Sequence, residues 1–368
     1  MVEPPAESGS TAQAPPAPAP PPAAFAPPAA PGAAPAPAPN ILRDLRTKLF
    51  KLLELPEIDD VPIRHILLSG FTRPDKYEPA EETFAVGTPR TTPPLAQVAT
   101  EWPRPRVYWH ILLGTLLVYF LLRLGFTSFE NINFLPGTLV VGAFLVPLAV
   151  VVFFFEMNTP KNVSVYQVGK MLLFGGTLGL IATLVIADLI RGSGTGELVP
   201  ALLTGVIEET GKLTALLLIA GNARYPWILN GLLFGAAVGA GFAGFESSGY
   251  AFVDLFGSGD LSNISLRAFL APFGHVIWTG MIGAALWKVR GKRPFEFGML
   301  LHPTVVKRWL VAVILHGLWD TRILHTTLPI QQIIIGLVGW LLIFAILKEG
   351  LSQVAAESKA GAAPPAPA

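Results

Sequence analysis

Residues 139–155 read LVVGAFLVPLAVVVFFF and carry no charged side chain. A second run, residues 333–347, is equally free of charge. An α-helix needs about 20 mostly apolar residues to cross the ~30 Å hydrocarbon core of a bilayer. Open sheets cannot satisfy their backbone polar groups in lipid. Both runs therefore predict membrane-spanning helices.

The composition of the whole chain agrees with a membrane protein. Of its 368 residues, 52% are hydrophobic and only 14% are charged, whereas about 25% of the residues of an ordinary soluble domain are charged. This excludes a water-soluble enzyme. The net charge of +1 gives no basic excess, so we expect no nucleic-acid partner. The absence of cysteine excludes disulfides, thiolate zinc sites and cysteine nucleophiles.

Further apolar segments of spanning length lie on both sides of residues 139–155. We predict eight spans, at 107–125, 134–156, 168–190, 198–221, 227–254, 266–287, 306–325 and 330–348. The expected fold is all-α, a polytopic integral membrane protein with about eight transmembrane helices. The lipid bilayer is therefore one of its partners.

The segments outside this transmembrane domain (107–348) differ from it in composition. Residues 1–40 are almost only Pro and Ala and predict a disordered tether. Residues 41–106 predict a cytoplasmic basic amphipathic helix and a linker, and residues 349–368 predict a disordered C-terminal tail. The amphipathic helix would either lie on an anionic leaflet or pack on a small soluble appendage made with residues 56–100.

The distribution of cations predicts the orientation. If the eight spans alternate in direction, most Lys and Arg residues fall on one side of the membrane. Only Arg123, Arg191, Arg267 and Arg322 fall on the other side. The side rich in cations is expected to be cytoplasmic. We therefore predict a multi-pass protein of the cell membrane with both termini in the cytoplasm.

Ionisable side chains lie inside four consecutive spans, where each costs about 2.5–3.5 kcal/mol at a helix centre. These residues are Glu208, Glu209, Lys212, Glu246, His275, His316 and Asp320. Neighbouring helices run in opposite directions, so one ionisable residue from each span falls at a common depth, roughly 12–15 Å below the outer surface at 1.5 Å per residue. The sequence thus predicts a polar pocket between these helices.

The motifs that carry these residues are Glu208-Glu209-Thr210-Gly211-Lys212, Phe242-Ala243-Gly244-Phe245-Glu246, His275 and His316-Gly317-Leu318-Trp319-Asp320. In this order they resemble the PrsW family of intramembrane proteases, which is related to the CAAX prenyl endopeptidases and the bacteriocin-processing membrane proteases. The resemblance covers roughly residues 107–348. It implies a polytopic helical peptidase that cuts a membrane-anchored protein. The typical substrate is an anti-sigma factor, cut at its extracytoplasmic side to start a signalling cascade.

Peptide hydrolysis needs a base that activates water, a group that stabilises the oxyanion and a proton donor for the leaving amine. A carboxylate in a low-dielectric pocket suits the base, and we assign this role to Glu208, on which the family resemblance also places catalytic weight. Glu209 would orient Glu208, bind a metal or pair with Lys212. Lys212 is expected to be a counter-ion for the glutamates, and Phe242 is expected to pack.

The candidate cofactor is a zinc ion. Glu246, His275 and His316 would bind Zn²⁺ with water in the open fourth position. Asp320, one helical turn after His316, would orient that imidazole. The competing mechanism is metal-free: a His donates to the oxyanion, and Asp320 could do so only if protonated. The catalytic candidates are thus Glu208, Glu209, His316 and Asp320, and the two mechanisms stay open.

A different class of function also uses buried Glu, Asp and His. An ion- or proton-coupled transporter carries such residues near the membrane midplane, on interrupted helices of an inverted repeat. Here the predicted pocket lies in the outer half of the membrane, and the sequence shows no inverted repeat. An inactive binding protein is the third alternative, and the complete set of motifs speaks against it.

Overall fold

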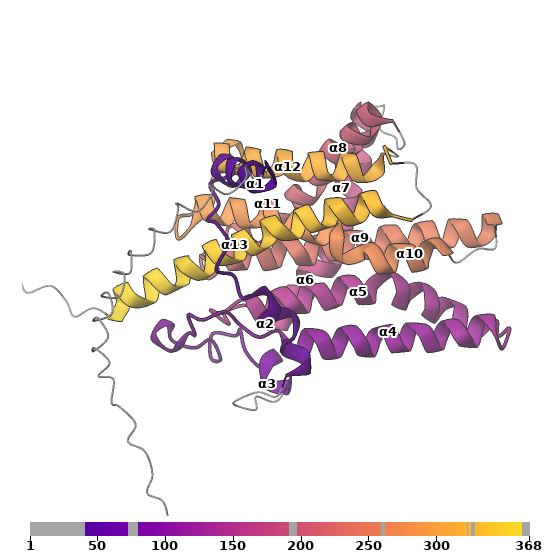
Figure 1. The fold of residues 1–368 in the computed structure, drawn as a ribbon, viewed down its shortest axis with the longest axis horizontal. Coiled ribbons are helices and arrows are strands. Elements are labelled where there is room, and N and C mark those ends of the chain that lie inside the picture. Colours follow the sequence, from indigo (N-terminus) through magenta and orange to yellow (C-terminus); the bar gives the residue numbers. More distant parts are fainter. Residues whose placement is uncertain are drawn as a thin grey trace, which may run out of the picture. The chain divides into compact units, whose positions relative to one another are not determined.

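The computed structural model describes residues 41–72, 80–190, 197–258, 262–321, 323–324 and 328–362. Within these ranges the regular structure is helical throughout, which confirms the all-α class (Figure 1). The predicted Pro/Ala tether, residues 1–40, lies outside them.

Long helices occupy all eight predicted segments. They are α4 (Arg106–Thr127), α5 (Leu135–Met157), α6 (Val165–Lys170) continued by the π-helical η4 (Met171–Gly175) and α7 (Gly176–Ile190), α8 (Leu198–Ala220), α9 (Ile228–Ser258), α10 (Ser262–Leu270) with α11 (His275–Arg290), α12 (Pro303–Asp320) and α13 (Ile330–Ala362). In the described part of the chain, six stretches are long and apolar enough to cross a membrane. These six leave out α8 and α12, which carry three charged residues each. The count of eight spans therefore stays a prediction.

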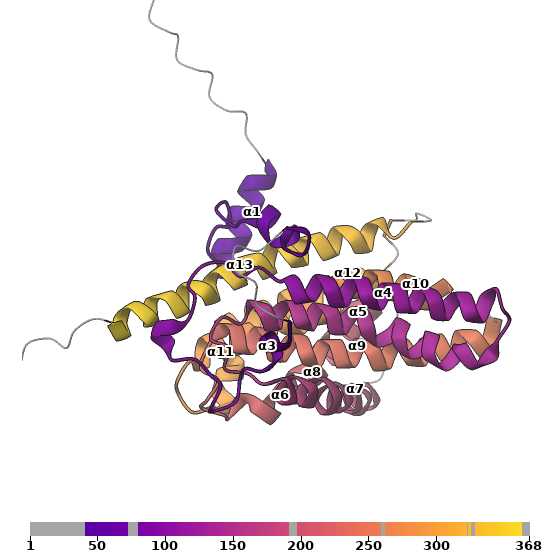
Figure 2. The same ribbon diagram turned by 90° about the horizontal axis from the view of Figure 1, so that it is seen from below.

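Helix α9 lies in the middle of the bundle, with α5 and α11 packed against it (Figures 1 and 2). The contact with α11 is made by backbone. A β-carbon on Gly235 would lie 2.2 Å from the carbonyl oxygen of Thr279, and one on Gly239 would lie 2.3 Å from that of His275. Small residues allow this close approach of two membrane helices. The approach brings the start of α11 beside α9.

We expect Gly239→Leu to separate α9 from α11, because the added side chain has no room. Overpacking of this kind costs about 1–3 kcal/mol. The measurement is thermal unfolding in detergent, followed by tryptophan fluorescence. Gly249→Leu is the matched control on the same helix, since Gly249 is exposed and nothing lies within 4 Å of its added β-carbon. Equal unfolding temperatures for the two variants would contradict the prediction.

The sixth segment, expected to be one helix over residues 266–287, is broken. It consists of α10, the 3₁₀ turn η5 (Ala271–Phe273), the turn residue Gly274 and then α11. Pro272 cannot donate a helical hydrogen bond, which favours a break here. Helix α13 fixes the break, because the Trp340 indole donates to the carbonyl oxygen of Pro272 at 2.9 Å. His275 is consequently the first residue of α11.

The segment after residue 348 is also helical where we expected a disordered tail. Helix α13 continues to Ala362 because its continuation is packed. Leu351 and Val354 are buried. The Gln353 side chain accepts a hydrogen bond from the backbone N–H of Ile228 at 2.9 Å.

The described residues between Leu42 and the first span fold onto the bundle. They form α1 (Ile41–Leu52), α2 (Ile63–Leu67), η1 (Ser69–Phe71), α3 (Ala80–Phe84) and η2 (Leu95–Gln97). Helix α1 covers the segment for which we expected the amphipathic helix. Phe50 and Ile66 are buried in the main core, so this region is more than a linker. Glu156 of α5 holds the start of α4, because its carboxylate accepts the backbone N–H groups of residues 106–108 at 2.7–3.0 Å.

Candidate functional site

Side chains from α8, α9, α11 and α12 meet at one place in the bundle. Every candidate from the sequence lies there. They are Glu208, Glu209 and Lys212 on α8, Phe242 and Glu246 on α9, His275 on α11, and His316 and Asp320 on α12. The predicted meeting of the four helices is therefore found, although His275 reaches it from a helix start and not from the middle of a span.

His316 is held by Glu209. Its Nδ1 lies 2.9 Å from the Glu209 Oε1, and both side chains are buried. Its ring also stacks on Trp278, with 4.8 Å between ring centroids. Assigned from these partners, Nδ1–H donates to Glu209. Nε2 faces Glu208 Oε2 and Asp320 Oδ2, each at 3.5 Å. We expected Asp320 to orient the imidazole. The buried Glu209 carboxylate lies closer to the ring, on the opposite nitrogen.

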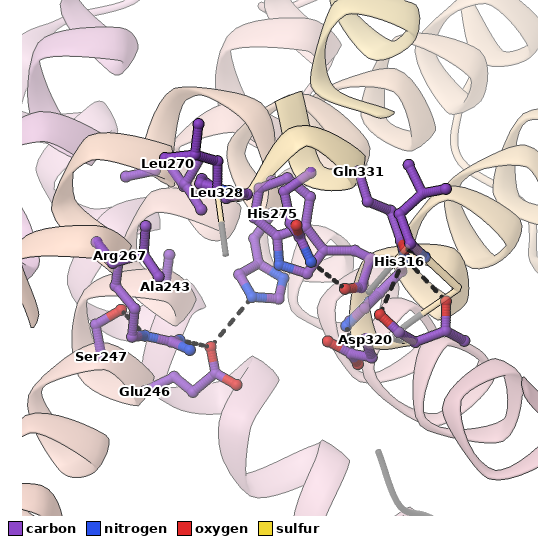
Figure 3. A pocket seen from close by; sticks show the side chains of 18 residues that line it. Ala243, Glu246, Ser247, Arg267, Leu270, His275, His316, Asp320, Leu328 and Gln331 are labelled. Atoms are coloured by element: carbon purple, nitrogen blue, oxygen red, sulfur yellow. Dashed lines mark hydrogen bonds and ion pairs between the residues drawn. The ribbon is translucent and has the colours of Figure 1, made fainter. Parts of the chain in front are cut away.

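His275 is held in a similar way by Glu246. Its Nε2 lies 3.1 Å from Glu246 Oε2, and the same oxygen accepts a hydrogen bond of 2.6 Å from Arg267 (Figure 3). The other ring nitrogen, Nδ1, lies 2.8 Å from the Lys212 Nζ. Each imidazole thus has one nitrogen on a carboxylate and turns the other toward α8.

Lys212 places a positive charge beside the two glutamates of α8. Its ammonium is fully buried and lies 2.8 Å from Glu209 Oε1 and 3.2 Å from Glu208 Oε2. It also lies 4.0 Å above the centre of the Phe242 ring. This is the position that we expected of Lys212 as a counter-ion of the glutamates. The Phe242 ring, expected only to pack, also contacts this cation.

Three donors are close enough to share a metal ion. One ligand atom each from Glu208, His275 and His316 lie within 4.8 Å of one another. Two imidazoles and a carboxylate are a ligand set that zinc takes in catalytic sites. Metal-binding histidines usually donate their other N–H to a carboxylate, as both do here. In addition, the buried Glu209 Oε2 has no hydrogen-bond partner among the described residues. The residues present therefore fit a divalent metal ion.

This group differs from the one that we expected. Glu208 takes the place of Glu246, which is engaged with Arg267 and with His275 Nε2. The break before α11 explains the difference, because it sets His275 between the two glutamates. Glu246 meets one ring nitrogen, and the other nitrogen points toward α8.

A cavity of about 550 Å³ opens beside these residues. Its polar lining includes Glu246, Arg267, His275, His316 and Asp320 (Figure 3). Apolar side chains from α10 and from the segment between α12 and α13 also line it, among them Leu266, Leu270, Leu324 and Leu328. The cavity has room for a short stretch of extended chain beside the ionisable groups.

Two residues of the site were not predicted as such. Arg267, which we counted only as an outer cation, pairs with Glu246 and donates to Ser247 at 2.9 Å. No sequence spacing could reveal this pair, since the two residues lie on different helices, α9 and α10. Trp278 stacks on His316 and could have been found, because it follows His275 by three residues on the same helix face.

Comparison with known families agrees with this site. A family model described as PrsW family intramembrane metalloprotease matches residues 159–347, just over half of the chain. The match includes every residue of the site. Searches of curated proteins and of solved structures give no match.

Proposed function

The chain belongs to the PrsW family of intramembrane metalloproteases, and from this premise we propose that it hydrolyses peptide bonds of membrane-anchored proteins at the cavity beside His275 and His316. The observation that carries the proposal is the convergence of Glu208, His275 and His316, with a carboxylate behind each imidazole. The transporter alternative has no comparable support from the site or the family.

Glu208, His275 and His316 would hold the metal ion, which we take to be Zn²⁺. When bound, such an ion polarises a peptide carbonyl and makes water a stronger nucleophile at neutral pH. Glu209 and Glu246 fix the rotation and the tautomer of the two imidazoles. Lys212 balances the negative charge of the two adjacent glutamates on α8.

Asp320 is our candidate for the general base. A carboxylate held as a ligand is a poor proton acceptor, so the role first given to Glu208 passes to a neighbour. Glu246 is unsuited because its Oε2 is paired with Arg267. Asp320 lines the cavity and is 20% exposed, and its ion-pair contact within the described residues is with His316. It would take a proton from the attacking water and pass it to the leaving amine.

Asp320→Asn is expected to lower the rate of substrate cleavage by about 10²-fold, the lower end of what general bases contribute. The affinity for a metal ion should stay unchanged, because Asp320 is outside the ligand group. Steady-state cleavage and Co²⁺ titration of the purified protein measure the two quantities. Cleavage at the parental rate would exclude Asp320 as the base.

The substrate is proposed to be a single-span membrane protein, such as an anti-sigma factor, cut near the extracytoplasmic face in regulated proteolysis. The apolar part of the cavity lining suits the flank of a transmembrane segment. The cavity includes the end of α12 and the start of α13. The opposite ends of these helices carry Lys307, Arg308 and Lys348. By the positive-inside rule that opposite end is cytoplasmic, as both termini then are.

The test compares membrane-protein fragments in cells that carry the wild-type chain or the Glu208→Gln variant. Quantitative proteomics should find at least one cleaved membrane protein in wild-type cells that stays intact in the variant. Immunoblotting must show equal amounts of the two chains in the membrane. If the fragment patterns are identical under conditions that activate the cascade, the proposed protease function is wrong.

A further inference from the structure

The surface of α1 carries a stripe of leucines that nothing in the described structure covers. Leu42, Leu45 and Leu52 are 78%, 57% and 57% exposed. Their spacing of three and seven residues places them along one side of the helix. A neighbouring side, with Phe50 and Leu53, is buried against the bundle. The helix is thus apolar over a wider arc than its packing requires.

The residues that follow α1 fasten it to the last turn of α11, the start of α12 and Lys348 of α13. The Glu54 carboxylate accepts hydrogen bonds from Lys307 at 3.2 Å and from Thr304 at 3.1 Å. The hydrogen bond from Lys307 is the main cause that holds the pKa of Glu54 below its usual value. Lys348 of α13 donates to the carbonyl oxygen of Glu57 at 2.7 Å. Helix α1 is therefore held at the level where α12 begins and where the predicted span 330–348 ends.

The direction of α1 matches a helix that lies in the plane of a membrane. From Leu42 onward it runs crosswise to the long helices, lying end-on in Figure 1 and upright in Figure 2. If the long helices cross the bilayer, α1 is parallel to its surface. Lys48 and Lys51 are exposed on the polar side of the helix. This combination of apolar stripe, flanking cations and crosswise direction is typical of interfacial helices.

A second apolar contact in this region, between Phe71 and Trp109, also supports a position at the membrane interface. Phe71 is 64% exposed and packs on Trp109, with 5.3 Å between ring centroids. Trp109 lies in the first turn of α4, where aromatic side chains mark the membrane interface. Residues 41–72 therefore expose apolar side chains at two places: the leucine stripe of α1, and Phe71 beside the first turn of α4.

We propose that α1 is an interfacial anchor: Leu42, Leu45 and Leu52 insert into the boundary between headgroups and acyl chains, and Lys48 and Lys51 contact anionic lipid headgroups. Through Glu54 and Glu57 the anchor fixes the start of α12 and Lys348 of α13 relative to the leaflet. It is independent of peptide hydrolysis, since none of its residues lies in the site. Its failure and the failure of the protease proposal are thus separate results.

The chain has no cysteine, so single labels can be placed without background. We would introduce Leu42→Cys, Leu45→Cys or Leu52→Cys, attach a nitroxide, and reconstitute the full chain in nanodiscs of phosphatidylcholine and phosphatidylglycerol. Collision with oxygen, which partitions into lipid, is compared with collision with a water-soluble nickel complex. Thr47→Cys is the matched control on the polar side of α1, and Leu117→Cys on α4 is the lipid-facing reference.

The oxygen-to-nickel ratio at the three leucine positions should exceed that at Thr47 by about threefold or more and approach that at Leu117. Replacing phosphatidylglycerol by phosphatidylcholine should lower the ratio. A ratio equal to that at Thr47 would show a helix in water and overturn the proposal. Low collision with both reagents would overturn it as well, because a protein would then cover the stripe. A ratio independent of lipid charge would exclude the headgroup contacts.

Discussion

Replacing Glu208 by Gln is expected to lower the cleavage rate of a purified single-span substrate by about 10³-fold or more, the scale on which loss of a central charged group slows an enzyme. Gln has nearly the shape of Glu but no charge. It therefore leaves the packing of α8 intact while it removes the carboxylate that we propose as a metal ligand, which is also a partner of Lys212. The assay follows release of a fluorescent fragment from a labelled substrate in detergent micelles.

The control for this experiment is Glu197→Gln. Glu197 stands just before α8, is exposed and makes no capping hydrogen bond with its side chain. This variant should cut at the parental rate. Both variants must elute as monodisperse protein with equal unfolding temperatures. Parental activity of Glu208→Gln under these conditions would remove Glu208 from the catalytic group.

The positions of the helices could be predicted from the sequence because the signal for a span is strong. Uncharged runs such as 139–155 leave few alternatives in lipid. The residues of the site could be predicted because they are ionisable residues within otherwise apolar segments. Glu208, Glu246 and His316 are costly inside an apolar segment, so each marks a place where helices must supply polar partners. Counting residues from the span ends led us to expect them near one another, and in the structure they line one site.

The partners of each side chain could not be predicted in the same way. Hydropathy does not show that the segment 266–287 breaks at Gly274, and this break decides which nitrogen of His275 meets which glutamate. The carboxylate closest to His316 was missed for a related reason. Spacing along α12 shows that Asp320 shares a face with His316, but it cannot show that Glu209 of another helix lies closer.

The packing of residues 41–106 also could not be predicted from the sequence. The leucine pattern indicated an amphipathic helix, but two different surfaces could accept its apolar face. The structure buries Phe50 and Leu53 and leaves the stripe with Leu45 exposed, so α1 contacts the bundle with only part of that face. A periodic pattern predicts a face, but it does not identify what the face contacts.

The second large effect that we expect is the loss of metal binding. It distinguishes the ligand set Glu208, His275 and His316 from the set Glu246, His275 and His316. The chain is freed of metal by a strong chelator and then titrated with Co²⁺, whose visible absorption reports ligand geometry. Chelation should abolish substrate cleavage, and Zn²⁺ should restore it. Glu208→Gln should lose Co²⁺ binding, because a ligand is gone. Glu246→Gln should weaken binding by only about 10–100-fold, the usual effect of removing a carboxylate behind a metal-bound histidine.

The comparison of these two variants is informative because both replace a glutamate that lies near His275. Glu246 meets Nε2, the nitrogen turned away from α8, so its loss frees the imidazole to rotate but removes no donor from the group with His316. If Glu246→Gln abolishes binding and Glu208→Gln retains it, the ligand set is Glu246, His275 and His316, and Glu208 returns to the role of general base. If the wild-type chain binds no ion and cuts substrate equally well in chelator, hydrolysis depends on the carboxylates alone, and the convergence of Glu208 with the two imidazoles serves proton transfer.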